Sequence, residues 1–253
     1  MEALFRVNGV LSFENLYKVD RPVIIAHRGA SQVERENTLE AFRAAIDMGA
    51  DAIEFDVRRT RDNVLVIHHD ACIASGTAPI NDLTYPEAVD LAKASNFHLP
   101  TLDETLKLCQ DKVALDIELK ENGYESDVIP LVGQYYDLDH VVFTSFYDDC
   151  VARLKEIAPQ IMAGLILGVD PPATLRTRLS ELLPLKRLKN CRADFVAPNY
   201  RLLKPGLIRR MRAAGYPVWV WTVNDVSLAD RLSKSKVAAI ITDTPDIIKR
   251  IAG

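Results

Sequence analysis

The sequence has few cysteines, and they are not arranged as a metal site or a disulfide framework. Only four occur among 253 residues, and none forms a CxxC motif: Cys72, Cys109, Cys150 and Cys191. Structural zinc sites and redox motifs depend on that spacing. Scattered thiols are usual in a reducing compartment. We therefore expect a cytoplasmic protein that uses neither disulfides nor cysteine-ligated zinc.

Long apolar runs and an excess of positive charge are also absent. No uncharged stretch reaches the roughly 18 residues of a membrane-spanning helix, and residues 1–20 lack a basic segment followed by an apolar one. The chain has 31 Lys and Arg against 35 Asp and Glu, a net charge of −4. Nucleic-acid binding would require a clustered basic surface. We therefore expect no membrane span, no secretion and no nucleic-acid partner.

The hydrophobic content is 48%, which is enough for a sizeable core. Short β-rich apolar runs alternate with segments of helical period, as in βα units around a parallel sheet. Helices are expected at Asn37–Met48, Asp148–Ile157 and Pro205–Ala214. Eight strands are expected, the number that closes a barrel: Val23–His27, Ala52–Val57, Val113–Leu119, Val141–Phe146, Ile161–Leu167, Phe195–Pro198, Val218–Val223 and Val237–Thr242. The pattern predicts an α/β fold, a single (β/α)8 TIM barrel over residues 1–253.

A ninth apolar run, Val64–His68, follows the second strand too closely for a parallel crossover, which needs a dozen or more residues. We expect it to form a β-hairpin extension with that strand. Residues 71–100 form the longest connection and are expected to be a short insertion. Residues 1–20 are expected to be an N-terminal extension, and the sequence indicates no role for them.

Polar residues finish several of the expected strands. In α/β barrels the active site lies at the carboxyl ends of the strands, so these residues are the candidates for chemistry. Two-residue alternation places Glu54 and Asp56 on one face of their strand. It likewise places Glu118 and Lys120 on one face of theirs. The candidates are His27, Arg28, Glu54, Asp56, His69, Glu118 and Lys120.

The three carboxylates Glu54, Asp56 and Glu118 repel one another at one mouth unless a cation neutralises them. Oxygen ligands without cysteine favour a hard divalent ion, magnesium, calcium or manganese. The sequence does not distinguish among these ions. Because the carboxylates are placed near the mouth, we expect Asp56 to contribute little to core stability.

Histidine exchanges protons near neutral pH, and two of the five histidines end strands beside the carboxylates. His27 and His69 are the expected acid–base pair. Strand alternation turns His68 to the opposite face from His69. His98 and His140 are placed in loops without supporting partners.

The residues above lie within short sequence blocks, which occur in this order: HRGA at His27–Ala30, ENTLEAF at Glu36–Phe42, GADAIEFDVRRTRDNVLVIHHD at Gly49–Asp70, LPTLDETL at Leu99–Leu106, LDIELK at Leu115–Lys120, TSF at Thr144–Phe146, VWTVND at Val220–Asp225 and IITDTPD at Ile240–Asp246. Together they resemble the glycerophosphodiester phosphodiesterase family, and the resemblance spans residues 22–250. The resemblance implies a (β/α)8 barrel that hydrolyses glycerophosphodiesters to sn-glycerol 3-phosphate and an alcohol.

The resemblance also implies roles for individual residues. His27 and His69 would transfer protons, Arg28 and Lys120 would contact the phosphate, and a divalent ion would lie on the three carboxylates, Glu54, Asp56 and Glu118. The nucleophile is left open between water and the neighbouring glycerol hydroxyl. An aromatic residue at a strand end can pack on glycerol or on a choline-like head group or can belong to the core. Phe146 and Trp221 are candidates of this kind.

Two departures from the family pattern concern the substrate side of the site. Arg35 stands where relatives commonly have proline, and the segment after Asp70, ACIASGTAPIND, diverges from the usual leucine, arginine and Gly-rich turn. Both leave the expected reaction unchanged. A phospholipase-like enzyme acting on intact phospholipid and a non-catalytic phosphodiester-binding barrel are the alternatives.

Overall fold

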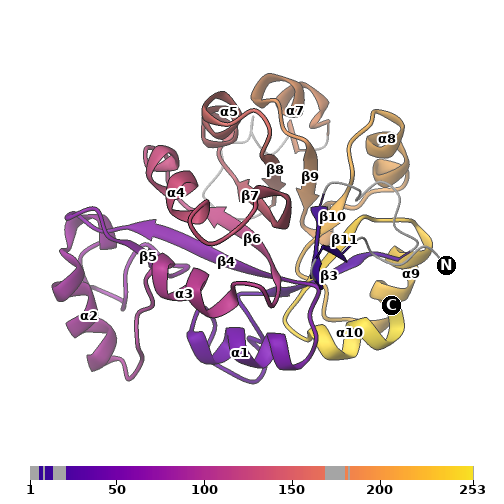
Figure 1. The fold of residues 1–253 in the computed structure, drawn as a ribbon. Helices are drawn as coiled ribbons and strands as arrows, with labels where there is room; N and C mark the ends of the chain where they lie inside the picture. The colour runs from indigo at the N-terminus through magenta and orange to yellow at the C-terminus, as the bar shows by residue number, and fades with distance from the viewer. Residues whose placement is uncertain (1–5, 8, 14–20, 169–179, 182, 253) are drawn as a thin grey trace.

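The computed structural model describes the chain except for residues 1–5, 8, 14–20, 169–179, 182 and 253 (Figure 1). Its centre is one sheet, in which eight parallel strands follow the order β10-β11-β3-β4-β6-β7-β8-β9 and β5 pairs with β4 alone. The strands are β3 (Val23–His27), β4 (Ala52–Arg59), β5 (Leu65–Ile67), β6 (Ala114–Leu119), β7 (Val141–Ser145), β8 (Met162–Leu167), β9 (Phe195–Pro198), β10 (Trp219–Val220) and β11 (Ala239–Thr242).

The two ends of this sheet meet. Parallel bridges join Val196 to Val218 and Asn199 to Trp221, which brings β9 beside β10. The sheet is therefore a nearly closed barrel of eight parallel strands, and the predicted (β/α)8 TIM barrel is confirmed. Two strands match the expected bounds, and β10 is shorter than expected, with regular pairing confined to Trp219–Val220.

Helices cover the outside of the barrel (Figure 1). Thr38 begins the first by accepting a hydrogen bond from the Ala41 amide, and Thr101 and Glu104 form a capping box that begins the third. The helices are α1 (Leu39–Asp47), α2 (Tyr85–Ala94), α3 (Leu102–Cys109), α4 (Glu125–Val132), α5 (Asp148–Ile157), α7 (Leu185–Cys191), α8 (Leu207–Ala213), α9 (Val226–Lys234) and α10 (Pro245–Ala252). The three helices expected from periodicity are present, with bounds shifted by at most two residues.

The interior of the barrel is filled by large side chains near the amino ends of the strands. The Phe195 ring stacks on Trp219, with centroids 4.1 Å apart. A Cβ atom on Gly164 would lie 2.2 Å from the Phe195 ring, so only glycine leaves room for this stack. Leu11 and Phe13 of the N-terminal extension belong to the same cluster, and the described part of that extension includes the hairpin β1 (Arg6–Val7) and β2 (Val10–Leu11).

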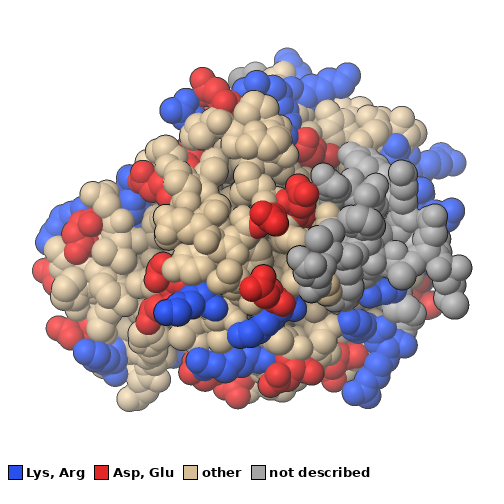
Figure 2. All heavy atoms as spheres, viewed as in Figure 1, with Lys and Arg blue, Asp and Glu red and all other residues tan. Residues whose placement is uncertain are grey.

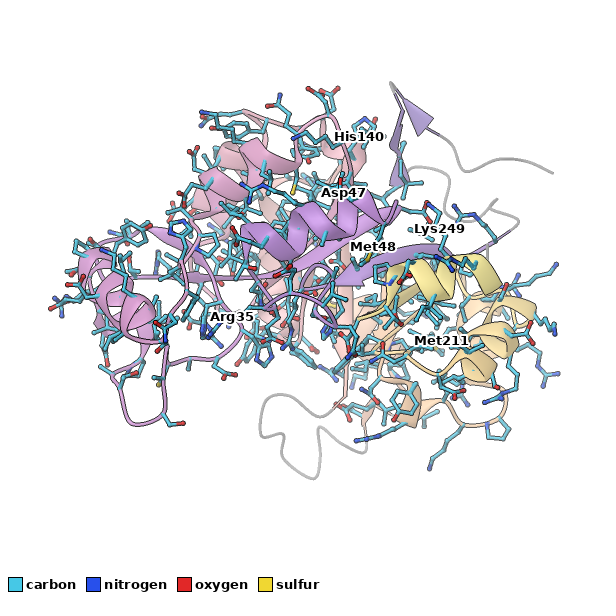
Figure 3. All side chains as sticks on the ribbon, turned by 90° about the horizontal axis from the view of Figure 1, so that it is seen from below. Arg35, Asp47, Met48, His140, Met211 and Lys249 are labelled. Atoms are coloured by element: carbon cyan, nitrogen blue, oxygen red, sulfur yellow. The ribbon has the colours of Figure 1, made fainter. Side chains whose placement is uncertain are left out.

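The β-hairpin extension and the insertion form a lobe on one side of the barrel (Figure 1). β5 pairs antiparallel with the end of β4, so that Val57 lies opposite Ile67, as expected from the short connection. The insertion contains α2, which packs on its own apolar cluster. Arg35 links the barrel to this lobe, because its guanidinium lies 3.7 Å from the centroid of the Phe97 ring (Figure 3).

Candidate active site

A pocket of about 380 Å³ opens at the carboxyl ends of the barrel strands. Every site residue expected from the sequence lines it except Asp56, which is buried and contacts Arg28 and Lys120 of the pocket wall. One part of the wall is charged, with His27, Arg28, Glu54, His69, Glu118 and Lys120. The other part is mostly apolar, with Phe146, Ile166, Ala197, Trp221 and Ile241.

The carboxylates form a compact buried cluster. Strand register places Asp56 opposite Glu118 on the neighbouring strand, and Glu54 two residues earlier on the same face. One oxygen from each of the three groups lies within 4.8 Å of the others. Asp56 has no exposed surface, so the surface position that the stability expectation assumed is wrong, and the effect of Asp56 on stability stays a prediction.

Two positively charged side chains lie against this cluster. Arg28 Nε is 3.2 Å from Asp56 Oδ2, and the Arg28 amide donates to Glu54 Oε2 at 2.9 Å. Lys120 Nζ is 2.7 Å from Glu118 Oε1 and 3.4 Å from Asp56 Oδ1. These are the two cations expected to contact phosphate, and here they neutralise part of the carboxylate charge.

Burial and mutual repulsion raise the pKa values of Glu54 and Glu118, whereas the two cations lower the pKa of Asp56. Burial raises the pKa of Asp56, but Lys120 and Arg28 overcome this effect and hold it below the usual range. Burial, followed by repulsion from Asp56, raises the pKa of Glu54 well above its usual value. Burial also raises the pKa of Glu118 to about 7, although Lys120 opposes the shift. Crowding therefore disfavours full ionisation of Glu54 and Glu118, and a nearby cation would favour their ionised forms.

Sequence reasoning missed a fourth carboxyl group, Asp116, which follows the same alternation two residues before Glu118. Asp116 Oδ1 accepts a hydrogen bond from Thr144 Oγ at 2.8 Å, and its Oδ2 is buried without a hydrogen-bond partner. Burial raises its pKa to about 8. The alternation used for Glu118 and Lys120 would have placed Asp116 on the inner face.

Asn37 was also missed, although it lies within the ENTLEAF block. Its side-chain amide donates to Asp56 Oδ2 at 2.7 Å, and its Oδ1 accepts from the Asp56 amide at 3.3 Å. These two bonds orient the carboxylate from a loop outside the strand. Nothing in the spacing of Asn37 and Asp56, 19 positions apart, indicates the contact.

A divalent cation fits this cluster. Burial and mutual repulsion raise the pKa values of Glu54, Asp116 and Glu118, and a divalent cation would offset that repulsion and favour their ionised forms. Asp56 Oδ1 and Glu118 Oε1 accept no hydrogen bond in suitable geometry, although Lys120 lies close to both. Buried oxygens of this kind are available to a metal, and an all-carboxylate donor set suits a hard ion.

Each of the two expected catalytic histidines pairs its Nδ1 with an aspartate. His27 Nδ1 is 2.7 Å from Asp243 Oδ1, and His69 Nδ1 is 2.8 Å from Asp70 Oδ1. Arg58 holds the loop that carries His69 by donating to its carbonyl oxygen at 3.0 and 2.6 Å. Of these partners, Asp243 and Arg58 were not expected from the sequence.

The other histidines lie elsewhere. His68 is absent from the pocket wall; its ring stacks on Phe97 and its Nδ1 lies 3.0 Å from the Asp70 carbonyl. His98 pairs with Glu104, and buried His140 contacts the Leu11 carbonyl.

The two aromatic residues share the apolar wall. Phe146 and Trp221 meet edge to face, with centroids 5.6 Å apart, and Trp221 Nε1 donates to the Ala197 carbonyl. Lys120 Nζ lies 5.5 Å from the Phe146 centroid. Trp219, two residues before Trp221, stacks in the core instead. The wall thus offers an apolar surface directly beside the charged residues.

A (β/α)8 barrel with paired histidines, clustered carboxylates and an Arg–Lys pair in one pocket is the architecture of a phosphoric diester hydrolase. The sequence profile of the glycerophosphoryl diester phosphodiesterase family matches residues 27–247. The chain belongs to this family.

Individual relatives and solved structures support the same family assignment. A glycerophosphodiester phosphodiesterase of Caldanaerobacter subterraneus is 30% identical over 246 residues, which cover 90% of this chain and 96% of the relative. The structure of an Oleispira antarctica phosphodiesterase in complex with the product sn-glycerol-3-phosphate is 26% identical, with a TM-score of 0.78 and coverage of 93% and 98%. A glycerophosphodiester phosphodiesterase structure from Parabacteroides distasonis has a TM-score of 0.76 at 26% identity, covering 92% and 97%.

Proposed function

We propose that this protein hydrolyses small glycerophosphodiesters to sn-glycerol 3-phosphate and an alcohol in a reaction that depends on a divalent cation. The observation that carries the proposal is the convergence of His27 and His69 with the carboxylate cluster in one pocket. Phosphate-binding proteins need no proton-transfer pair, so this combination favours catalysis over binding alone. The product complex of the Oleispira antarctica relative supports the same product class.

Glu54, Asp56 and Glu118 would hold the cation. When bound there, magnesium, calcium or manganese supplies Lewis-acid polarisation of the phosphoryl oxygens. Asn37 and Arg28 keep the Asp56 carboxylate in place for this role.

The side chains of the protein perform the remaining steps. Arg28 and Lys120 stabilise negative charge on the phosphoryl oxygens as it increases in the transition state. One of the two histidines takes the proton from the attacking oxygen, which belongs either to water or to the neighbouring glycerol hydroxyl, and the other gives a proton to the leaving oxygen. The two aspartates at the Nδ1 atoms orient the rings, so that the second nitrogen of each is directed to the reaction.

The apolar wall supports binding of the uncharged part of the substrate. Phe146 and Trp221 present an edge-to-face pair beside Lys120, which suits the carbon skeleton of glycerol or of a small head group. The free thiols, three of them buried, suit a reducing cytoplasm.

The test is release of glycerol 3-phosphate from glycerophosphocholine, glycerophosphoethanolamine and glycerophosphoglycerol by protein treated with a chelator. We expect activity to vanish on chelation and to return with magnesium, calcium or manganese. Asp56→Asn should lower metal affinity. Asp47→Asn, an exposed change at the end of α1, is the matched control and should behave as wild type. Full turnover in excess chelator would contradict the metal requirement, and no release from any diester would overturn the proposed reaction.

A further inference from the structure

Two of the sequence blocks, VWTVND and IITDTPD, contribute Asn224 and Asp243, which reach the proposed reaction through the ring of His27. Asn224 follows β10, and Asp243 follows β11, the strand that pairs with β3 and thereby brings Asp243 beside His27. We propose that Asp243, clamped by Asn224 and Ser31, is a positioning residue that fixes the proton of neutral His27 on Nδ1. This inference rests on the proposed acid–base role of His27.

Asp243 is surrounded by donors. His27 Nδ1 lies 2.7 Å from Oδ1, Ser31 Oγ donates to the same oxygen at 3.0 Å, and Asn224 Nδ2 donates to Oδ2 at 2.6 Å. The side chain of Asp243 is 26% exposed and does not line the pocket. Its contact with the reaction therefore runs through His27.

The orientation of the Asn224 amide is determined by its other contacts. Its Oδ1 accepts from the Asp243 amide at 2.9 Å and from Thr242 Oγ1 at 3.0 Å. A backbone amide can only donate, so the Asn224 atom that the Asp243 amide contacts must be the oxygen. The amide nitrogen of Asn224 must therefore face Asp243, where it can only donate.

The same contacts keep Asp243 ionised. Burial raises its pKa, but hydrogen bonds from His27, Asn224 and Ser31 outweigh this effect and lower the pKa to about 2. An ionised carboxylate accepts hydrogen bonds and donates none. His27 Nδ1 must then carry a proton, and in the neutral ring Nε2 is the nitrogen that remains to accept one in the pocket.

The substitution Asp243→Asn reverses the direction of the hydrogen bond to His27, because it introduces an amide that can donate. Its NH₂ group must face either the Asn224 NH₂ group or His27 and Ser31. The first choice opposes two donors, whereas the Ser31 hydroxyl and a neutral imidazole nitrogen can each accept. Asp243→Asn should therefore turn its donor toward His27 Nδ1 and move the imidazole proton to Nε2, with little change in shape.

The direct test is ¹⁵N NMR of the histidine rings in the magnesium-loaded protein, with His27 assigned from the His27→Ala spectrum. We expect the Nδ1–H tautomer in wild type and the Nε2–H tautomer in Asp243→Asn. Because this readout needs no turnover, it remains informative if the protein fails to cleave glycerophosphodiesters and the proposed function is wrong. An Nε2–H tautomer in wild type, or an unchanged tautomer in Asp243→Asn, overturns the inference.

Kinetics with glycerophosphocholine provide the second test. Asp243→Asn should lower kcat by about 10²-fold or more, the lower end for a general acid–base group, with KM changed by less than about threefold. In the His27→Ala background it should cause no further loss, since Asp243 acts only through that ring. Asp246→Asn, a control at a half-buried residue of α10 that pairs with Arg250 outside the pocket, should leave activity unchanged.

An additive loss in the His27→Ala background, or wild-type kcat in Asp243→Asn, would show that Asp243 has a structural role alone. If circular dichroism shows that Asp243→Asn does not fold, Asn224→Ala tests the same clamp, because it removes one donor and leaves the carboxylate. We expect it to lower kcat by about tenfold through the weaker hold on Asp243, again only when His27 is present. Unchanged kcat in a folded Asn224→Ala protein would then refute the proposal.

Discussion

The loop that carries His69 is held at several separate points. The carbonyl oxygen of His69 accepts two hydrogen bonds from the buried Arg58 guanidinium. Arg58 lies on β4, where it follows Glu54 and Asp56 on the same face of the strand. The next residue, Asp70, is largely exposed but still reaches His69 Nδ1. A strand of the barrel thus supplies both the carboxylate cluster and the support for the second histidine.

Neighbouring His68 serves as a matched control for His69. We expect His69→Ala to lower kcat by about 10²- to 10⁴-fold, because it removes a proton-transfer group from the pocket. His68→Ala should lose a stacking contact with Phe97 and a hydrogen bond to the Asp70 carbonyl, and should retain activity within about tenfold because His68 does not line the pocket. Initial rates with glycerophosphocholine at saturating metal measure both. Equal losses at the two positions would contradict the assignment of His69 to the reaction.

Among the elements, the junction of α1 and β4 depends on one buried carboxylate. Asp51 accepts two hydrogen bonds from Arg21, at 2.7 and 2.9 Å, and one from the Ile24 amide at 3.0 Å. Lys249 of α10 reaches it at 3.2 Å, beside the end of α1 (Figure 3). Asp51 therefore ties the start of β3, the start of β4 and the last helix together.

Asp51→Asn should lower the free energy of unfolding by about 2 to 3 kcal/mol at pH 7, the range for hydrogen bonds to charged groups. Burial raises the pKa of Asp51, but Arg21 and the other partners lower it below 3.8 overall. The stabilisation is therefore fully present above pH 3.8 and is lost as the pH falls through the folded-state pKa.

Urea unfolding of both proteins at several pH values measures this difference. The difference in free energy of unfolding between wild type and Asp51→Asn should decrease on acidification. The free energy of unfolding of Asp47→Asn should stay within about 0.5 kcal/mol of wild type throughout. A difference in free energy of unfolding that increases below pH 3.8 would show that the pKa of Asp51 is raised in the folded state.

At the scale of the whole molecule, the described surface carries mixed charge and little exposed apolar area. Acidic and basic side chains are interspersed on the face shown in Figure 2. Large apolar side chains that are exposed occur singly along the described chain, and they are Val33, Tyr147, Ile157, Leu183, Val226 and Ile247. Within the described residues, no helix combines the length and apolar character needed to cross a membrane.

Such a surface favours small diesters over lipids. Extracting an acyl chain from a bilayer costs roughly 0.8 kcal/mol per CH₂ unless apolar protein surface replaces the lipid. We expect glycerophosphocholine and glycerophosphoethanolamine to be cleaved far faster than the parent phospholipids in vesicles at matched concentration. Equal rates on vesicles would identify a phospholipase-like enzyme, while leaving the metal and histidine proposals intact.

Much of the fold and of the charged pocket follows from the sequence by itself. Parallel strands direct their carboxyl ends to one face, and two-residue alternation directs Glu54 and Asp56 to one side. Local rules therefore suffice to bring the expected residues to one mouth. The same rules place β5 in a hairpin, because its connection to β4 is too short for a crossover.

Only the tertiary structure determined which side chains hold these residues in place. His27 and Asp243 are 216 positions apart and meet because β3 and β11 pair, which depends on closure of the barrel. Asn37 reaches Asp56 from a loop, and burial of Asp56 follows from packing on all sides. Hydrogen bonds of this kind cannot be predicted from the periodicity of the sequence. They join strand residues to loops, and the folding of the whole barrel sets the positions of those loops.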